Sequence, residues 1–190
     1  MRRALVVFGS KRGGTAGLAR MVGAELSKLG WSVVVQDAVQ PADLRDLDLV
    51  VIGGALYSDR WHKAARTFAR SHEQALRSVP VWLFSSGPLD DSADPGDLAA
   101  VAQVQGIARR LEARGHMTFG GRLVADPKGF LARSMAKKLA GDYRSPGQVA
   151  DWVLQIQHDL APAEIVLPTP RTATHDEVTV RQRNRVRSQT

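Results

Sequence analysis

Short apolar runs alternate with segments of helical periodicity along most of this 190-residue chain. The apolar runs that predict strands lie at residues 5–8, 32–36, 49–52, 79–84 and 117–123. Apolar side chains at helical spacing predict helices at 15–29, 61–76, 98–114, 130–140 and 148–160. The polar stretch 41–47 is a candidate for a further short helix. Strands that alternate with helices form a parallel sheet covered by helices on both faces. We therefore expect an α/β protein of three layers around a five-stranded parallel sheet.

The alternating pattern ends near residue 160, and we expect one domain over residues 1–160. Residues 161–190 contain three prolines and no apolar periodicity, which predicts a flexible basic tail. In the domain, a glycine-rich loop after the first strand favours the doubly wound strand order 2-1-3-4-5. Ligands of such sheets bind outside the carboxyl ends of the strands.

The loop after the first strand combines hydroxyls, cations and glycines just before a helix. Neither the dinucleotide pattern G-x-G-x-x-G nor the nucleotide P-loop fits, because Thr15 stands where a P-loop has lysine. The free N–H groups at a helix N-terminus nevertheless favour a phosphate there, and glycines let the backbone approach it. The alternative is an ordinary turn between strand and helix. The candidate phosphate-binding residues are Ser10, Lys11, Arg12, Gly13, Gly14 and Thr15.

Two further loops are expected at the same edge of the sheet. Tyr57 and Trp61 are large aromatic residues in the loop after the third strand, where one ring could stack on a flat ligand, or both could cap the sheet edge. A lone histidine at the start of a helix, such as His62, more often has a surface or structural role than a role in ligand binding. The other loop follows the fourth strand. The candidate residues in these two loops are Ala55, Leu56, Tyr57 and Trp61 after the third strand, and Ser85, Ser86, Gly87 and Pro88 after the fourth.

The stretch Ser10-x-Arg12-Gly13-Gly14-Thr15 resembles the flavodoxin phosphate loop, which usually reads [ST]-x-T-G-x-T. Arg12 departs from the usual threonine, and a guanidinium could replace that hydroxyl contact. The resemblance implies a flavodoxin-like fold and FMN as the cofactor, with its phosphate at residues 10–15. It also implies a function in electron transfer to a redox partner.

Two other stretches resemble flavodoxin-domain proteins of the menaquinone-dependent protoporphyrinogen oxidase type. They are residues 53–64 and residues 119–146, where that family has a basic insertion with apolar residues. This resemblance implies an FMN-dependent oxidoreductase that oxidises a tetrapyrrole precursor and passes electrons to a quinone. The alternatives are an electron carrier without its own substrate and a flavodoxin-like binding protein without cofactor. No catalytic side chain is assigned, because flavin chemistry belongs largely to the cofactor.

Charge and composition bear on partners and location. The chain has 26 basic and 19 acidic residues, a formal net charge of +7, and no cysteine. No histidine spacing predicts a metal site. Residues 128–144 carry an apolar stripe flanked by cations, which fits peripheral contact with an anionic membrane or an anionic small-molecule substrate. An ordinary helix that packs its stripe on the sheet is the favoured alternative. We expect a cytoplasmic protein with no nucleic-acid partner, since neither a signal peptide nor a membrane span is evident.

Overall fold

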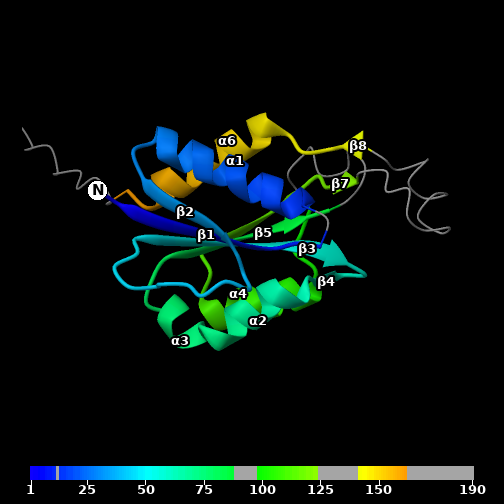
Figure 1. Cartoon of the computed structure of the whole chain (residues 1–190), viewed down its shortest axis with the longest axis horizontal. Coiled ribbons are helices and arrows are strands. Elements are labelled where there is room, and N and C mark those ends of the chain that lie inside the picture. Colours follow the sequence, from blue (N-terminus) through cyan, green and yellow to red (C-terminus); the bar gives the residue numbers. More distant parts are fainter. Residues whose placement is uncertain (12, 88–97, 124–140, 162–190) are drawn as a thin grey trace, which may run out of the picture. The chain divides into compact units, whose positions relative to one another are not determined.

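The computed structural model describes residues 1–11, 13–87, 98–123 and 141–161 of the chain. Its centre is a parallel sheet of five strands in the order β2-β1-β3-β5-β6 (Figure 1). Counted along the chain, these five strands confirm the predicted order 2-1-3-4-5. A sixth strand, β4, pairs antiparallel with β3. The strands are β1 (Arg3–Gly9), β2 (Ser32–Asp37), β3 (Leu49–Tyr57), β4 (Arg60–Trp61), β5 (Val81–Ser86) and β6 (Gly115–Phe119).

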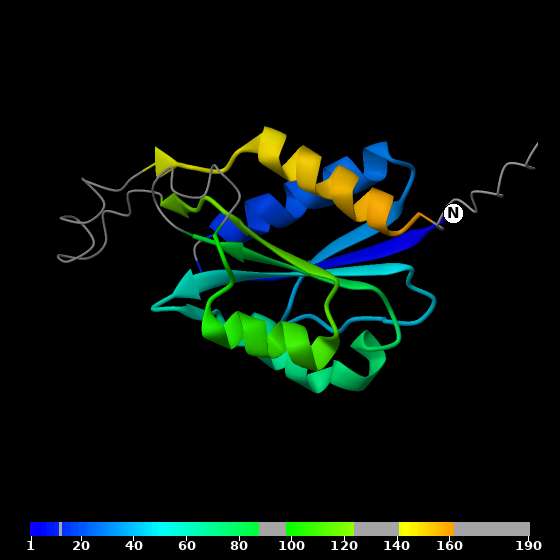
Figure 2. The same cartoon turned by 180° about the vertical axis from the view of Figure 1, so that it is seen from behind.

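Helices cover both faces of the sheet, as the alternating sequence pattern predicts. Helices α1 (Gly14–Lys28) and α6 (Pro146–Asp159) lie together on one face. Helices α2 (Lys63–Ser71), α3 (Glu73–Leu76) and α4 (Ala102–Leu111) lie on the other, and the view from behind in Figure 2 shows the same division. The fold is therefore an α/β sandwich of three layers.

The central strands are buried on both sides, and their side chains alternate between two cores. Ala4 and Val6 of β1 belong to the core beneath α1 and α6, whereas Leu5 and Val7 belong to the core beneath α2 and α4. This alternation follows from the two-residue period of a strand. It explains why β1 is a continuous apolar run in the sequence.

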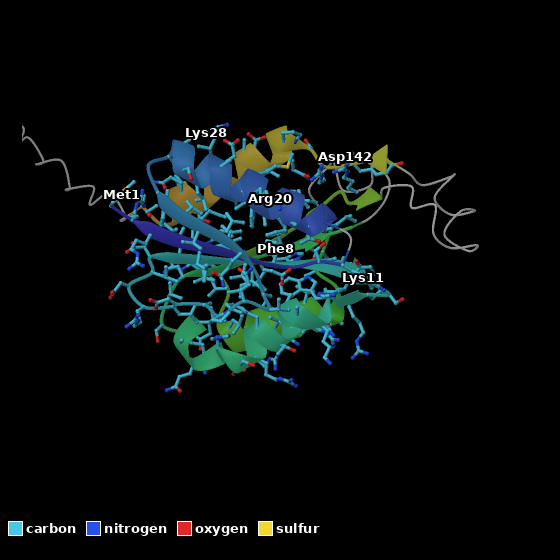
Figure 3. The ribbon with its side chains drawn as sticks, in the orientation of Figure 1. Met1, Phe8, Lys11, Arg20, Lys28 and Asp142 are labelled. Carbon is cyan, nitrogen blue, oxygen red and sulfur yellow. The ribbon has the colours of Figure 1, made fainter. Side chains whose placement is uncertain are left out.

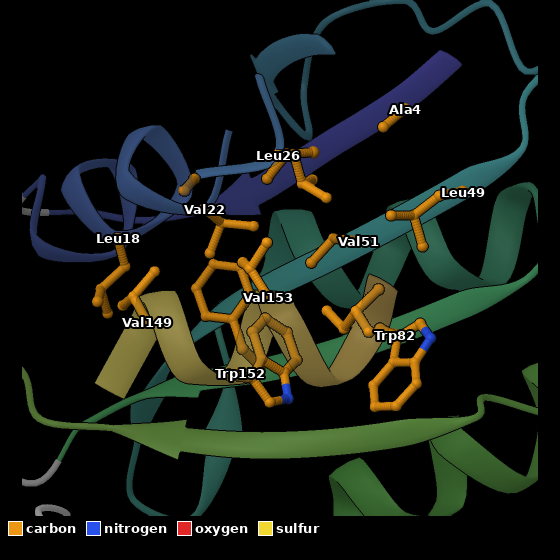
Figure 4. Packing of buried hydrophobic residues seen from close by; sticks show 14 of the residues in the cluster. Ala4, Leu18, Val22, Leu26, Leu49, Val51, Trp82, Val149, Trp152 and Val153 are labelled. Carbon is orange, nitrogen blue, oxygen red and sulfur yellow. The ribbon is translucent and has the colours of Figure 1, made fainter. Parts of the chain in front are cut away.

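The core beneath α1 and α6 is built around Trp152. Leu18 and Val22 of α1 face Val149 and Val153 of α6 within this cluster, and Figure 4 shows the indole of Trp152 among them. The ring of Trp152 makes edge contacts with three other aromatic rings of the sheet, those of Trp82, Phe84 and Phe119. Edge-to-face pairs of this kind stabilise the core beyond the burial of their area.

Strand β3 is longer than the sequence predicts. The expected strand ends at Ile52 before Gly53 and Gly54, but β3 continues through both glycines to Tyr57. The glycines make room rather than turn the chain. A Cβ on Gly53 would lie 2.0 Å from the Phe84 ring, and one on Gly54 would lie 2.3 Å from the Trp61 ring. The missing side chains thus allow two aromatic rings to lie on the sheet.

The helix expected at 61–76 is divided. Trp61 pairs with Leu56 in strand β4, so α2 starts at Lys63, and a break at His72 separates α2 from α3. Residues 41–47 form no helix. The helix expected at 148–160 is confirmed by α6, and the one expected at 130–140 lies outside the described residues.

Two more boundaries differ at the far edge of the sheet. Helix α4 starts at Ala102 rather than at 98, and ends where Glu112 takes a left-handed conformation with φ 53°. The helix was expected to reach residue 114, but Gly115, the next residue, already belongs to β6, opposite Trp82. A Cβ on Gly115 would lie 2.2 Å from the Trp82 ring, so the glycine again makes room for an indole.

A small antiparallel ribbon follows the main sheet. It consists of β7 (Arg122–Leu123) and β8 (Gly141–Asp142). Chain contacts group Met1–Leu160 as one unit, and residues 162–190, predicted as a tail, lie outside the described residues. None of the helices in the described ranges has the length and apolar content needed to cross a bilayer.

Candidate functional site

The carboxyl ends of three neighbouring parallel strands bring the candidate loops to one edge of the sheet. Gly9 of β1 pairs with Gly54 of β3, and Gly54 in turn lies opposite Ser85 of β5. The loop after β1, the hairpin after β3 and the residues after β5 therefore leave the sheet side by side. Figure 3 shows Lys11 where β1 passes into α1, at this edge.

The loop after β1 leaves the N-terminus of α1 without a side-chain cap. Gly13 stands at the N-cap of α1 with φ 80°, a left-handed conformation that favours glycine. Its N–H donates to the Ser10 hydroxyl at 3.1 Å, which fixes the bend. Helix α1 has no side-chain cap and no acidic residue in its first turn. Its first N–H groups and its dipole thus present an anion-binding end.

Thr15 provides the observation that points most directly to a ligand. The residue is 1% exposed, and its Oγ1 has no hydrogen-bond partner among the described residues. An enclosed hydroxyl without a partner costs about 1–3 kcal/mol. A phosphate at the N-terminus of α1 would supply the acceptor that this hydroxyl lacks. The described part of the loop therefore fits a phosphate group, and Arg12 lies outside the described residues.

The hairpin after β3 exposes one aromatic ring. Ser58 and Asp59 both have positive φ, 46° and 58°, which is the geometry of a tight two-residue hairpin turn. Tyr57 is 42% exposed beside this turn. Its ring lies edge-on to His62, with 6.2 Å between the centroids. His62 itself caps α2, because its Nδ1 accepts from the Ala64 N–H at 3.4 Å. Tyr57 thus presents a ring at the edge where the phosphate loop lies.

Trp61 lies in the core, although the sequence made it a candidate for stacking on a ligand. It is 1% exposed and packs over Gly54. Its backbone N–H donates to Gln103 Oε1 at 2.8 Å, and its indole N–H donates to the Ser85 hydroxyl at 2.9 Å. Both faces of the residue are thus occupied by the protein, so this ring is not available to stack on a ligand.

The residues at the end of β5 are also enclosed. Ser85 is 1% exposed and Ser86 7% exposed. The Ser85 hydroxyl lies 2.9 Å from His116 Nε2, in addition to accepting from Trp61. It therefore holds the sheet edge together rather than facing a ligand. Gly87 has φ 142°, a value that favours glycine, and its N–H donates to the Phe119 carbonyl at 3.0 Å. Pro88 lies outside the described residues.

His116 completes this internal network, and no pattern in the sequence pointed to it. Burial lowers the pKa of His116 from 6.5 to about 4, so the ring is neutral at pH 7. Because the Ser85 oxygen accepts from Trp61, its own proton can be donated to His116 Nε2. The neutral ring then carries its hydrogen on Nδ1. This chain of hydrogen bonds joins β4, β5 and β6 beneath the candidate site.

The β7–β8 ribbon lies against the start of α1. A Cβ on Gly14 would meet the Arg122 backbone at 3.3 Å, and one on Gly17 would overlap the Arg144 guanidinium. Arg144 Nε donates to Asp142 Oδ1 at 2.6 Å, and Arg122 Nε lies 3.8 Å from Asp142 Oδ2. Hydrogen bonding to Arg144 lowers the pKa of Asp142. Two guanidinium groups thus share one carboxylate beside the helix end.

Three other predicted site residues lie near this edge without a direct part in the network. Ala55 is nearly buried, and its carbonyl accepts from the His62 N–H at 2.8 Å. Leu56 is half-buried and packs against the core beneath α2 and α4. Lys11 is exposed next to the start of α1. The structure therefore brings Ser10, Gly13, Thr15 and Tyr57 to one edge of the sheet, with the Thr15 hydroxyl enclosed there, and engages Trp61 and Ser85 in internal hydrogen bonds.

Comparison with known proteins adds independent information. The model of a family described as the flavodoxin domain matches residues 5–148. None of the curated proteins compared with the chain matches it. Flavodoxin 1 from Bacillus cereus is similar in fold, with a TM-score of 0.54, 13% identity, and coverage of 84% of this chain and 99% of the flavodoxin.

A larger protein is similar over part of its length. A mutant of a flavo di-iron protein from Thermotoga maritima has a TM-score of 0.56 and 13% identity, over 84% of this chain. The chain spans only 36% of that protein. At such identities the likeness concerns the fold alone.

Proposed function

Because the chain belongs to the flavodoxin domain family, whose model matches residues 5–148, we propose that it binds FMN and transfers electrons to a redox partner. The family implies a flavin; the choice of FMN is our own inference. It rests above all on Thr15, whose enclosed hydroxyl lacks a partner among the described residues at a helix N-terminus without a side-chain cap. FMN has a single terminal phosphate, which matches a loop without a dinucleotide glycine pattern.

The described residues fit the phosphate through three kinds of donor. The N–H groups of Gly14 and Thr15 lie in the first turn of α1, which has no side-chain cap, and the Thr15 hydroxyl lies in the same turn. Ser10 fixes the loop by accepting from Gly13, and it can still donate its own hydroxyl proton to a phosphate oxygen. Lys11 and Arg12 would add charge. Charge-assisted hydrogen bonds of this kind are the stronger ones.

The ring of the flavin would lie against the hairpin after β3. Tyr57 is exposed at that edge and steadied by His62, which supports a stacking role for it. Trp61 supports the site from below, and its place in the core argues against direct contact. Bound FMN supplies the capacity to accept and donate electrons, singly or in pairs. The residues of this chain would hold and orient the cofactor.

Mass spectrometry of the native protein, purified without added flavin, tests the cofactor. We expect one FMN per chain, released intact on denaturation. Release of FAD or a nicotinamide dinucleotide would contradict the single-phosphate site. A colourless protein that fails to take up added FMN would favour a flavodoxin-like binding protein without cofactor.

The second candidate function is an oxidoreductase with its own substrate, of the protoporphyrinogen oxidase type. The β7–β8 ribbon favours it, because Arg122 and Arg144 bring two cations next to the start of α1 and share one acidic partner. These cations could attract an anionic small-molecule substrate, with a quinone as electron acceptor. Residues 124–140 between the two strands lie outside the described residues. Under this second candidate function, we propose that residues 128–144 contact a membrane surface.

An anaerobic assay with protoporphyrinogen and a soluble menaquinone analogue separates the two candidates. An oxidoreductase should produce protoporphyrin at a rate proportional to protein concentration. A carrier should show no such turnover, yet should pass electrons from a chemical reductant to a redox protein. Co-sedimentation with anionic and neutral vesicles tests the membrane contact, which is expected only with anionic vesicles at low salt.

A further inference from the structure

A groove with a volume of about 350 Å³ lies between α2 and α4, and basic side chains line it. Helix α2 contributes three cations along one stripe, spaced three and four residues apart. Helix α4 contributes a fourth cation, a polar residue and a glycine at the same spacing. The residues that define this basic groove are Lys63, Arg66, Arg70, Gln103, Gly106 and Arg110.

The spacing shows that the two helices turn these stripes toward the same groove. Residues three, four and seven apart lie on one face of a helix. Two helices packed on a sheet usually fill such a seam with apolar side chains. Here Gly106 leaves the seam open, since a Cβ at this position would have no neighbour within 4 Å. The groove is therefore a feature of the sequence on both helices.

The four cations of the basic groove have no acidic partner in the part of the chain that the structure describes. No acidic residue among the described ones lines the groove. The Nε atom of Arg66 is enclosed and makes no hydrogen bond among the described residues. Other surface cations do find partners: Arg77 pairs with Glu112, and Arg45 with Asp43 at 2.7 Å. The missing counter-charge thus distinguishes the groove from these surface pairs.

Like charges one turn apart repel one another and destabilise a helix. Lys63 and Arg66 are three residues apart, and Arg66 and Arg70 are four apart, so α2 carries this repulsion along its length. A partner with several negative charges would remove it. The three cations of α2 span about 10 Å of helix at 1.5 Å per residue. Carboxylates spaced one helical turn apart on a partner would match that span.

The groove begins at the edge where the flavin is proposed to bind. Gln103, in the groove lining, accepts the backbone N–H of Trp61 through its Oε1. Lys63 follows His62, whose ring contacts Tyr57. A molecule seated in the groove would therefore lie next to the hairpin that bears Tyr57. A redox partner has to approach this edge to exchange electrons.

We propose that the basic groove docks an acidic segment of the partner protein with which the chain exchanges electrons. That the partner is a redox protein rests on the proposed function, whereas the docking of an acidic segment rests on the groove alone. A protein segment suits the site better than a small anion, because Lys63, Arg70 and Arg110 are exposed and spread along the groove. Exposed cations distributed over two helical turns give orientation and fast association.

Fluorescence anisotropy with a labelled decaglutamate peptide tests the docking. The double variant Arg66→Gln/Arg70→Gln should bind the peptide about tenfold more weakly than the unmodified chain at low salt. The matched control is Arg20→Gln/Arg109→Gln, which removes the same charge from exposed positions outside the groove. The control should bind within about twofold of the unmodified chain. Equal losses in both variants would reduce the effect to net charge and overturn the proposal.

Competition with unlabelled anions shows which class of ligand the basic groove binds. Inorganic tripolyphosphate or a decathymidylate that displaces the peptide at a lower concentration than unlabelled peptide would indicate a small-anion or a nucleic-acid site and overturn the proposal. Both double variants should retain the FMN affinity of the unmodified chain. If no form of the chain binds FMN, the proposed function fails, whereas the peptide result still decides the docking.

Discussion

The indole N–H of Trp61 donates to the Ser85 hydroxyl across 2.9 Å in the interior of the protein. This bond explains why an aromatic residue and a serine, both expected at a ligand site, face one another instead. Together with His116 it ties the short strand β4 to β5 and β6. These hydrogen bonds lie beneath the candidate site. They show that Trp61 and Ser85 support the site rather than touch a ligand.

Replacement of Ser85 by alanine tests this supporting role. The variant leaves the Trp61 indole N–H and His116 Nε2 without their common partner, so the free energy of unfolding should fall by about 1–3 kcal/mol. FMN affinity should change little. Urea denaturation measures the first effect and flavin titration the second. The exposed Ser32→Ala variant is the control and should stay within about 0.5 kcal/mol. A large loss of FMN affinity with unchanged stability would place Ser85 in the site.

The stability of the protein should depend on pH through His116. Burial lowers the pKa of this histidine from 6.5 to about 4, so between these values the unfolded chain binds a proton more readily than the folded one. The full contribution is present above about pH 6.5, is lost as the pH falls toward about 4, and amounts to about 3 kcal/mol.

Denaturation midpoints measured between pH 4 and pH 7 check this dependence. A difference curve against His116→Gln removes the contribution of carboxylates that titrate in the same range. The exposed His158→Gln variant serves as the control and should keep the dependence of the unmodified chain. A difference curve without slope would show that His116 titrates normally.

Thr15→Val should act in opposite directions on the free protein and on FMN binding. Valine keeps the shape and removes an enclosed hydroxyl that has no partner among the described residues, so the FMN-free protein should be as stable or more stable. FMN affinity should fall by about 1–3 kcal/mol, because the phosphate loses a donor. Thr15→Ser should restore most of it. Unchanged affinity in the valine variant would leave Thr15 as a structural residue only.

Tyr57 and Trp61 should differ sharply when each is replaced by alanine. Tyr57 is 42% exposed, so its loss should weaken FMN binding while the free energy of unfolding stays within about 0.5 kcal/mol. Trp61 is buried, and its loss should cost about 3–5 kcal/mol of stability. Thermal melts and flavin titrations of both variants decide the matter. Equal destabilisation by the two changes would contradict the division between site and support.

The sequence predicted the sheet and its order because the strands are short apolar runs that need burial on both faces. The position of the glycine-rich loop between β1 and α1 was predictable for a similar reason, since the loop follows directly after the first strand. Its phosphate-binding function stays a prediction. Strand β3 was predicted too short, because two successive glycines, Gly53 and Gly54, usually indicate a turn. The sequence alone does not show that aromatic rings occupy the space beside them. The partners of these glycines, Phe84 and Trp61, come from other parts of the fold.

Pairs that are distant in sequence account for the other differences. His116 lies 31 positions from Ser85, and Gln103 lies 42 positions from Trp61, so no local pattern could announce either contact. An aromatic residue after a strand fits a stacking role and a core role equally well in sequence. The basic groove could not be predicted for the same reason, because the basic residues of α2 and α4 line one groove only when the fold places the two helices side by side.

A titration of the FMN-free 190-residue chain with FMN and with riboflavin, followed by flavin fluorescence, tests the central claim most directly. The two ligands share the ring system, and only FMN has the phosphate. If the start of α1 holds the phosphate through two or more charge-assisted hydrogen bonds, FMN should bind at least about a hundredfold more tightly than riboflavin. Equal affinities for the two flavins would contradict a phosphate site at residues 10–15.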